Sequence, residues 1–154
     1  MKVFKVLFTT VAMALIISCG DDVEPIGPKL PTGEISYLGK ATTGQSDGSS
    51  YEQDSVVVTL DLFSDNKTLA TMVMNAVKFA SKMPGIDMTI DSVSVETNAK
   101  VLLLSGENIV PIAMGGPFLS RIITHLHGTV TQDSLIVSMN GGDSPMSFRG
   151  GLKK

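Results

Sequence analysis

The sequence predicts an all-β protein with one small antiparallel domain. Short segments in which apolar and polar residues alternate with a period of two recur along the chain, and Gly-, Ser- and Asp-rich turns separate them. After the N-terminal apolar segment, no long stretch has the 3.6-residue apolar period of a helix. The length of 154 residues is enough for one ordinary domain.

The composition excludes two classes of protein. Hydrophobic residues make up 43% of the chain and charged residues 18%, a balance that is typical of a packed core and not of intrinsic disorder. The net charge is −3, whereas a nucleic-acid-binding protein carries a basic excess. We therefore expect a globular protein that does not bind nucleic acid.

Residues 1–18 have the parts of a secretory signal peptide. Lys2 and Lys5 supply the positive start, and Val6–Ile17 is an apolar run of twelve residues without charge. That run is too short for a permanent transmembrane helix, which needs about 20 residues. We therefore expect this segment to be a targeting signal that is cleaved off on export.

The end of the run, Leu-Ile-Ile-Ser-Cys at Leu15–Cys19, resembles the cleavage box of bacterial lipoproteins. In that family the cysteine becomes the new N-terminus and carries lipid on its sulfur and amine. The resemblance implies lipidation of Cys19 and a membrane anchor without a transmembrane helix. Cys19 is the only cysteine, so no intramolecular disulfide can form. Cleavage would leave ten basic residues against 15 acidic ones, a formal charge of −5.

Residues 19–31 are expected to be a tether between the lipidated cysteine and the domain. Three prolines in a polar stretch favour an extended, non-helical chain. The acidic residues directly after Cys19 resemble the signal that sends lipoproteins of Bacteroidota to the outer surface. That resemblance implies an outer-membrane lipoprotein at the cell surface. A solvated acidic linker and a periplasm-facing location are the alternatives.

The domain is expected over residues 32–154. The first half should contain strands at Glu34–Ala41, Ser55–Phe63 and Thr68–Phe79, with a loop at Thr42–Ser50 and a turn at Ser64–Lys67. The clearest strand is the second, in which four aliphatic residues face one way: Val56, Val58, Leu60 and Leu62.

In the strand expected next, over residues 86–95, the apolar residues change from one face to the other. Ile86, Met88 and Ile90 alternate with polar residues, and after Asp91 the apolar positions become Val93 and Val95. A shift of one residue would turn half the strand's apolar side to water. The pattern therefore predicts a bulge or a tight turn near residues 91–92.

The second half of the domain is less regular. Val101–Leu104 is a continuous apolar run, expected to be buried on both faces or covered by a neighbouring segment. Gly106–Phe118 is irregular and rich in Gly and Pro, and Leu119–Val130 is the longest strand candidate. Two final strands have their own apolar sets, one of Leu135, Val137 and Met139 and one of Met146, Phe148 and Leu152.

These segments make about eight strands, each with one apolar face. Such strands need a second sheet or closure of the sheet on itself. An eight-stranded barrel has no free edges, and its interior holds side chains or one small ligand. Periodicity alone leaves both a small antiparallel barrel and a β-sandwich open.

Several segments resemble a known family. They are Val77–Ala80 with Met83-Pro84, Leu104–Pro111, Ala113–Phe118, Gly128–Val130 and Met146–Gly150. Together they resemble the calycin-like (lipocalin-like) β-barrel domains of Bacteroidota lipoproteins, over Thr32–Gly150. The resemblance implies a lipid-anchored eight-stranded barrel that can hold an interior cavity, and it implies no catalytic residues.

His125 and His127 form the sharpest candidate site. Residues two apart on a strand share a face, so the two imidazoles can approach one metal ion. A third ligand would have to be a carboxylate from a neighbouring strand, because the chain has no other His and Cys19 lies on the tether. The alternative puts both histidines on an outer polar face beside Arg121, with Leu126 on the core face.

Four methionines are candidates for a ligand-binding interior. Flexible thioethers suit adaptable apolar surfaces, and they also fill irregular cores. The candidates are Met72, Met74, Met88 and Met139. We expect them either to line a cavity or to form an ordinary core.

Catalytic motifs are absent from the sequence. Its Gly-rich stretches are not followed by Gly-Lys-Ser/Thr, and it has no Gly-x-Ser-x-Gly elbow. Asp87 and Asp91 share a strand face, which more often marks the wet side of a strand than a carboxylate pair for glycoside chemistry. We therefore expect no enzymatic activity and no cofactor.

Three functional hypotheses follow. The first is a lipid-anchored envelope lipoprotein whose barrel binds a small apolar ligand without catalysis. The second is a filled barrel that binds another envelope protein through the irregular segment, with Ile109, Val110, Ile112 and Phe118 at its surface or as a plug. The third is a metal-binding or hydrolytic site at the His-x-His strand.

Overall fold

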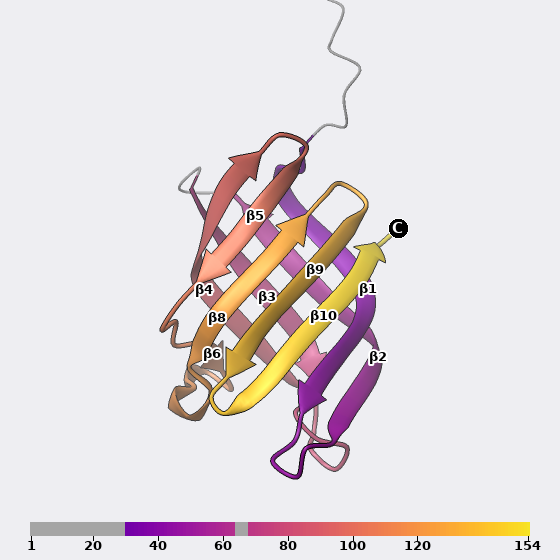
Figure 1. The fold of residues 1–154 in the computed structure, drawn as a ribbon, viewed down its shortest axis with the longest axis vertical. Coiled ribbons are helices and arrows are strands. Elements are labelled where there is room, and N and C mark those ends of the chain that lie inside the picture. The colour runs from indigo at the N-terminus through magenta and orange to yellow at the C-terminus, as the bar shows by residue number, and fades with distance from the viewer. Residues whose placement is uncertain (1–29, 64–67) are drawn as a thin grey trace, which may run out of the picture.

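The computed structural model describes residues 30–63 and 68–154, which form a single antiparallel β-structure (Figure 1). The elements are β1 (Gly33–Gly44), β2 (Ser50–Leu62), β3 (Leu69–Val77), β4 (Ile86–Asn98), β5 (Val101–Gly106), β6 (Ile112–Ala113), β7 (Gly116–Pro117), a 3₁₀ helix η1 (Leu119–Arg121), β8 (Ile123–Val130), β9 (Ser134–Gly141) and β10 (Ser144–Leu152). The expected signal peptide, Cys19, most of the tether and the turn at 64–67 lie outside the described residues.

Eight of the strands close into a barrel. Each of β1, β2, β3, β4, β5, β8, β9 and β10 pairs antiparallel with the next, and β10 pairs with β1. The pairing of β3 with β4 completes the circle, as in Met74↔Met88. This confirms the predicted small calycin-like barrel and excludes the β-sandwich. The short strands β6 and β7 form a hairpin whose first strand pairs with β4.

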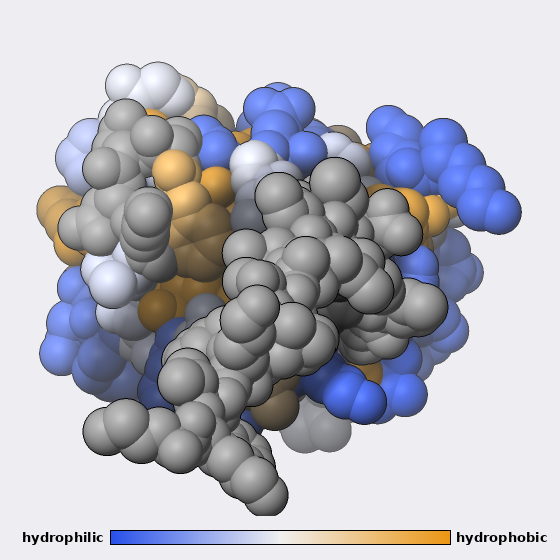
Figure 2. Space-filling view, turned by 90° about the horizontal axis from the view of Figure 1, so that it is seen from above, coloured by the Kyte–Doolittle hydropathy of each residue, from blue (hydrophilic) through white to orange (hydrophobic). Residues whose placement is uncertain are grey.

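The apolar faces of all eight strands meet inside the barrel. On β2, the four aliphatic residues predicted to share a face are all buried, as are the sets on β9 and the first two residues of the set on β10. Side chains without any exposed surface are Tyr37, Val58, Leu60, Met72, Met74, Val77, Met88, Ile90, Val93, Ile123, Leu126, Val130 and Leu135. A view from above, at the end where β1 begins, shows apolar residues near the middle of the visible part and hydrophilic residues along much of its edge (Figure 2).

A bulge changes the phase of β4 where the sequence predicted it. Ala70 pairs with Val93 and Met72 pairs with Ile90, so Asp91 and Ser92 together face the single residue between them on β3. Ser92 has a φ of 61°. The bulge brings Val93 to the same interior as Ile90, and both are fully buried.

Three further bulges were not predicted. In β2, Ser55 has a φ of 61°, and the register against β1 shifts between Gly39 and Ala41. In β3, Ala76 has a φ of 50°, and the register shift there places Val77 inside the barrel, not on the outer face with Val73. In β8, His125 has a φ of 52°, and the register shifts between Thr124 and His127. Each bulge moves the residues that follow it to the other face of the sheet.

Some predicted boundaries and faces were wrong. The loop expected at Thr42–Ser50 is only residues 45–49, because β1 continues to Gly44 and β2 begins at Ser50. The segment Leu119–Val130 is not the longest strand: it begins with η1, and β2 and β4 are longer at 13 residues each.

Side-chain placement also differs from the prediction in two strands, β10 and β5. Leu152 is 39% exposed, since it lies at the end of β10 beyond the packed interior. The apolar run of β5 is not buried on both faces: Leu102 and Leu104 are buried, whereas Val101 and Leu103 are half-buried on the outside. Aliphatic residues on the outer face had hidden the alternation of this strand.

Candidate functional site

The four candidate methionines lie inside the barrel, where they fill space. Met72, Met74 and Met88 have no exposed surface, and Met139 is 3% exposed. Met74 pairs across the strands with Met88, and Met139 pairs with Met146. A void that admits a water molecule would give accessible surface to the side chains around it. The fully buried middle of the barrel is therefore occupied by the protein's own side chains.

A cluster from three segments closes the lower end of the barrel. The rings of Phe79 and Phe118 meet edge to face with centroids 6.2 Å apart, and the guanidinium carbon of Arg121 lies 4.6 Å from the centroid of Phe79. Arg121 Nη1 also donates to the carbonyl of Gly141 at 3.1 Å and to Ser144 Oγ at 2.8 Å. These contacts join the segment after β3, the segment before β8 and the turn between β9 and β10, and we call the cluster of Phe79, Phe118 and Arg121 the plug.

Sequence reasoning missed this plug. It placed Arg121 on the outer face of a long strand beside the histidines, whereas Arg121 belongs to η1 at the end of the barrel. Phe79 was expected at the end of a strand, but it follows β3 and turns into the barrel end at 2% exposure. Phe118 and Arg121 are close together in the sequence, but Phe79 is far from both, so no local pattern indicated that the three side chains would meet.

His125 and His127 both point outward from β8 and are exposed. The bulge leaves His125 and Leu126 opposite Met139, so the two histidines are not a simple pair two residues apart on a regular strand. The His125 backbone N–H donates to Glu107 Oε2 at 2.8 Å. Within residues 30–63 and 68–154, no group of three His, Cys, Asp or Glu side chains could hold a metal ion.

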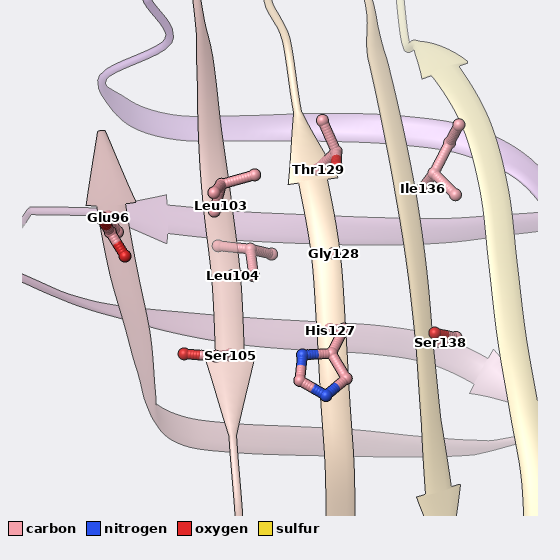
Figure 3. A pocket seen from close by; sticks show the side chains of 9 residues that line it. All are labelled: Glu96, Leu103, Leu104, Ser105, His127, Gly128, Thr129, Ile136 and Ser138. Atoms are coloured by element: carbon pink, nitrogen blue, oxygen red, sulfur yellow. The ribbon is translucent and has the colours of Figure 1, made fainter. Parts of the chain in front are cut away.

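A shallow hollow of about 460 Å³ surrounds His127 on the outer wall (Figure 3). In cross-strand register, His127 lies between Ser105 of β5 and Ser138 of β9. Figure 3 shows the imidazole between the two hydroxyl groups, with Leu103 and Ile136 on the same wall. A second hollow of about 500 Å³ contains His125 and shares Ser138 with the first. No hydrogen bond joins His127 to either serine among those found in the described residues.

The segment from residue 107 to residue 122, here called the distal segment, has a buried side and an exposed side. Ile109 and Phe118 pack against the core, so part of the segment does act as a plug. Four large apolar side chains of the same segment are exposed: Val110 at 39%, Ile112 at 46%, Met114 at 75% and Leu119 at 66%. Ile112 and Met114 line a hollow of about 470 Å³ with Ile86 of β4.

Tyr37 is a titratable group whose pKa is strongly raised. Its hydroxyl donates to the carbonyl of Thr131 at 2.7 Å at the upper end of the barrel. Burial, together with the negative charge of Asp133, raises the pKa of Tyr37 to about 12. The group therefore stays neutral at physiological pH and acts as a structural donor.

No helix in the described part of the chain is long and apolar enough to cross a membrane. Comparison of the chain with protein-family models, with curated proteins and with solved structures found no match.

Proposed function

We propose that this chain is a lipid-anchored protein of the bacterial outer membrane whose filled barrel presents the distal segment to another envelope protein. The proposal combines the lipoprotein-like sequence at Leu15–Cys19 with the architecture of the barrel. In this proposal the barrel is a rigid spacer and the distal segment is the binding element.

The observation that carries the proposal is the exposure of four large apolar side chains on one short segment. Val110, Ile112, Met114 and Leu119 keep between 39% and 75% of their surface in water. Burial of apolar surface stabilises a complex by about 25 cal/mol per Å². Exposed apolar surface of this kind is therefore typical of interaction sites, and Ile112 and Met114 lie together at one hollow.

The position of this surface favours a protein partner over the chain's own membrane. β1 begins at one end of the barrel, and the distal segment joins β5 to β8 at the opposite end (Figure 1). β2 has 13 residues; at about 3.3 Å per residue and a tilt of about 40°, the ends are roughly 30 Å apart. A lipid at Cys19 would attach the chain to the membrane through this first end, so the distal segment lies at the end farther along the barrel from the attachment.

The filled interior is the reason to prefer this function over small-ligand binding. Met72, Met74 and Met88 have no exposed surface, so a guest would have to displace core side chains. Displacing a packed core costs free energy that weak apolar contacts do not return. The residues at the two histidines likewise offer no third metal ligand within the described chain.

Photocrosslinking in living cells tests the proposal. A photoreactive amino acid at Met114 or Leu119 should give one discrete crosslinked product, and the same group at the exposed Ser94 on the wall should give none. The product should disappear when Ile112→Asp is added, while the far-UV circular dichroism of the protein is unchanged. Equal crosslinking from position 94, or none from either distal position, would contradict the proposal.

Native mass spectrometry of the full chain in detergent distinguishes the small-ligand hypothesis. An organic adduct that disappears on denaturation would favour ligand binding. A bare protein mass together with the distal crosslink would favour the protein partner.

A further inference from the structure

The methionines of the described chain fall into two groups. Met83, in the segment after β3, is 36% exposed, and Met114 in the distal segment is 75% exposed. The others lie inside the barrel and are at most 4% exposed: Met72, Met74, Met88, Met139 and Met146. An oxidant dissolved in water has to reach the thioether sulfur before it can react. Among the described methionines, Met114 is therefore the one that such an oxidant meets most readily.

Met114 lies at the tip of a hairpin whose base is fixed to the barrel. β6 pairs with β4, and the N–H of Phe118 donates to the carbonyl of Pro111 at 2.7 Å at the base of the hairpin. Met114 and Gly115 form the two-residue turn between β6 and β7, with φ values of 54° and 81°. Positive φ at both positions is typical of a type I′ turn, in which Asn-Gly and Asp-Gly are the usual pairs. The tip thus carries a large apolar side chain where turn chemistry favours a small polar one.

The space around this tip is open. A Cβ atom added at Gly115 or Gly116 would have no heavy atom within 4 Å apart from its chain neighbours. Met114 and Ile112 lie at the surface hollow of about 470 Å³ beside β4. An oxygen atom added to the Met114 sulfur would therefore not enter a packed core, and the barrel would keep its fold. The same change at the fully buried Met74 would place an unpaired polar group in the interior.

We propose that Met114 is an oxidation site through which hydroperoxides weaken the docking of the distal segment. The sulfur lone pair attacks the terminal oxygen of a hydroperoxide ROOH, so that an S–O bond forms and the O–O bond breaks. The sulfur loses two electrons and becomes a sulfoxide. The RO group takes up these electrons together with the hydroxyl proton and leaves as the alcohol ROH, which is water when the oxidant is hydrogen peroxide. This inference rests on the proposed function, because it concerns the regulation of the same surface.

The sulfoxide makes the docking surface polar at the most exposed of its four apolar side chains. Its oxygen accepts hydrogen bonds from water, and burial of that oxygen against an apolar partner surface without a donor costs free energy. Ile112 lies at the same hollow, so its apolar contact is disturbed as well. We expect docking to weaken about ten-fold, which removes most of the crosslinked product described above.

Peptide mapping tests the modification without a partner. The full chain in detergent is treated with hydrogen peroxide, and the sulfoxide content of each methionine is followed by mass spectrometry. Met114 should oxidise fastest and Met83 more slowly, whereas the buried methionines should oxidise only after unfolding in urea. Far-UV circular dichroism should stay unchanged while Met114 oxidises. Equal rates at Met114 and Met74, or loss of the fold in step with oxidation of Met114, would overturn the proposal.

Crosslinking in cells tests the effect on docking. With the photoreactive group at Leu119, hydrogen peroxide should remove most of the crosslinked product. Met114→Leu forms no sulfoxide and should keep the product in peroxide, whereas Met83→Leu, the matched control, should leave the loss unchanged. Met114→Gln places a polar amide at the tip and should reduce the product without peroxide. Loss of the product from the Met114→Leu chain in peroxide would assign the effect to another group and refute the proposal.

The crosslinking result also separates this inference from the proposed function. If Leu119 gives no product before peroxide is added, the proposed function fails and its regulation fails with it. If the product forms and withstands complete oxidation of Met114, docking stands and only its regulation by oxidation is refuted.

Discussion

Ser55 and Ser92 adopt the same left-handed backbone conformation, each with a φ of 61°. Both are the middle residue of an Asp-Ser-Val tripeptide, and both lie where a strand shifts register against its neighbour, Ser55 in β2 and Ser92 in β4. The valine that follows each serine is buried. One local sequence thus forms a bulge twice in this barrel, and each bulge delivers a valine to the core.

The Ser92 bulge makes a prediction about stability. A left-handed conformation costs a non-glycine residue about 1–2 kcal/mol, whereas glycine adopts it freely and loses about 0.5–1 kcal/mol through its flexible unfolded state. Ser92→Gly should therefore raise the free energy of unfolding by roughly 0.5–1 kcal/mol. Urea unfolding followed by circular dichroism measures this, because the chain has no Trp for fluorescence.

Ser94→Gly is the matched control for that measurement. Ser94 is exposed on the same strand and is not among the residues with positive φ. The substitution should lower the free energy of unfolding by about 0.5–1 kcal/mol. Equal changes in the free energy of unfolding for Ser92→Gly and Ser94→Gly would show that the left-handed backbone at Ser92 does not lower the stability of the protein.

The two bulges also show what a sequence can predict. In β4, apolar residues occupy both sides of the bulge, so the change of phase from Ile90 to Val93 is visible in the sequence. In β2, the inner-face residue that precedes the bulge is Gln53, which is polar. Its side chain donates a hydrogen bond to the carbonyl of Ala76 and accepts one from the backbone N–H of Lys78. No apolar alternation precedes Val56 there, so no phase change could be recognised.

The barrel and its core were largely predictable, and the sites were not. Period-two patterns in Val56–Leu62 and Leu135–Met139 predicted which side chains face the interior of the barrel. The plug formed by Phe79, Phe118 and Arg121 depends on three-dimensional contacts between distant segments, which leave no local period. The alignment of His127 with Ser105 and Ser138 on the outer wall likewise exists only through the register of three strands.

The buried methionines should be essential for stability. Met74→Ala removes a fully buried side chain from the middle of the barrel and leaves a cavity. We expect a loss of about 2–5 kcal/mol in the free energy of unfolding. Met114→Ala is the control, because Met114 is 75% exposed; its effect should stay within about 0.5 kcal/mol. A small effect of Met74→Ala would show that the interior is looser than its burial indicates.

The plug should depend on the shape of the Arg121 side chain and not on its charge alone. Arg121→Lys keeps the positive charge but loses the planar group that stacks on Phe79 and donates to Gly141 and Ser144. We expect a loss of about 1–3 kcal/mol in unfolding experiments. Arg149→Lys, at an exposed position of β10, should change stability by less than about 0.5 kcal/mol. Similar values for the two variants would contradict the role of the plug.

Tyr37 should make the protein less stable at alkaline pH. Burial, together with Asp133, raises the pKa of Tyr37 from 10.0 to about 12. The folded state therefore holds the phenolic proton more tightly than the unfolded state, and this contribution is complete below pH 10 and is lost as the pH rises toward 12. The melting temperature should fall over that interval. Tyr37→Phe should flatten the fall, whereas Tyr51→Phe should retain it; a steep fall in both variants would assign the effect to other groups.

Lipidation should depend on the thiol of Cys19 and not on the hydroxyl group of Ser18. Cys19→Ala removes the only thiol in the chain, so metabolic labelling with an alkyne fatty acid should give no labelled protein, and the chain should leave the membrane fraction. Ser18→Ala keeps a small residue before the cysteine and should leave labelling and fractionation unchanged. If the Cys19→Ala chain stayed in the membrane fraction, removal of residues 1–18 would show whether the uncleaved apolar run Val6–Ile17 or the barrel provides the attachment. In the second case the distal segment, with its exposed apolar side chains, would be the first surface to examine for membrane contact.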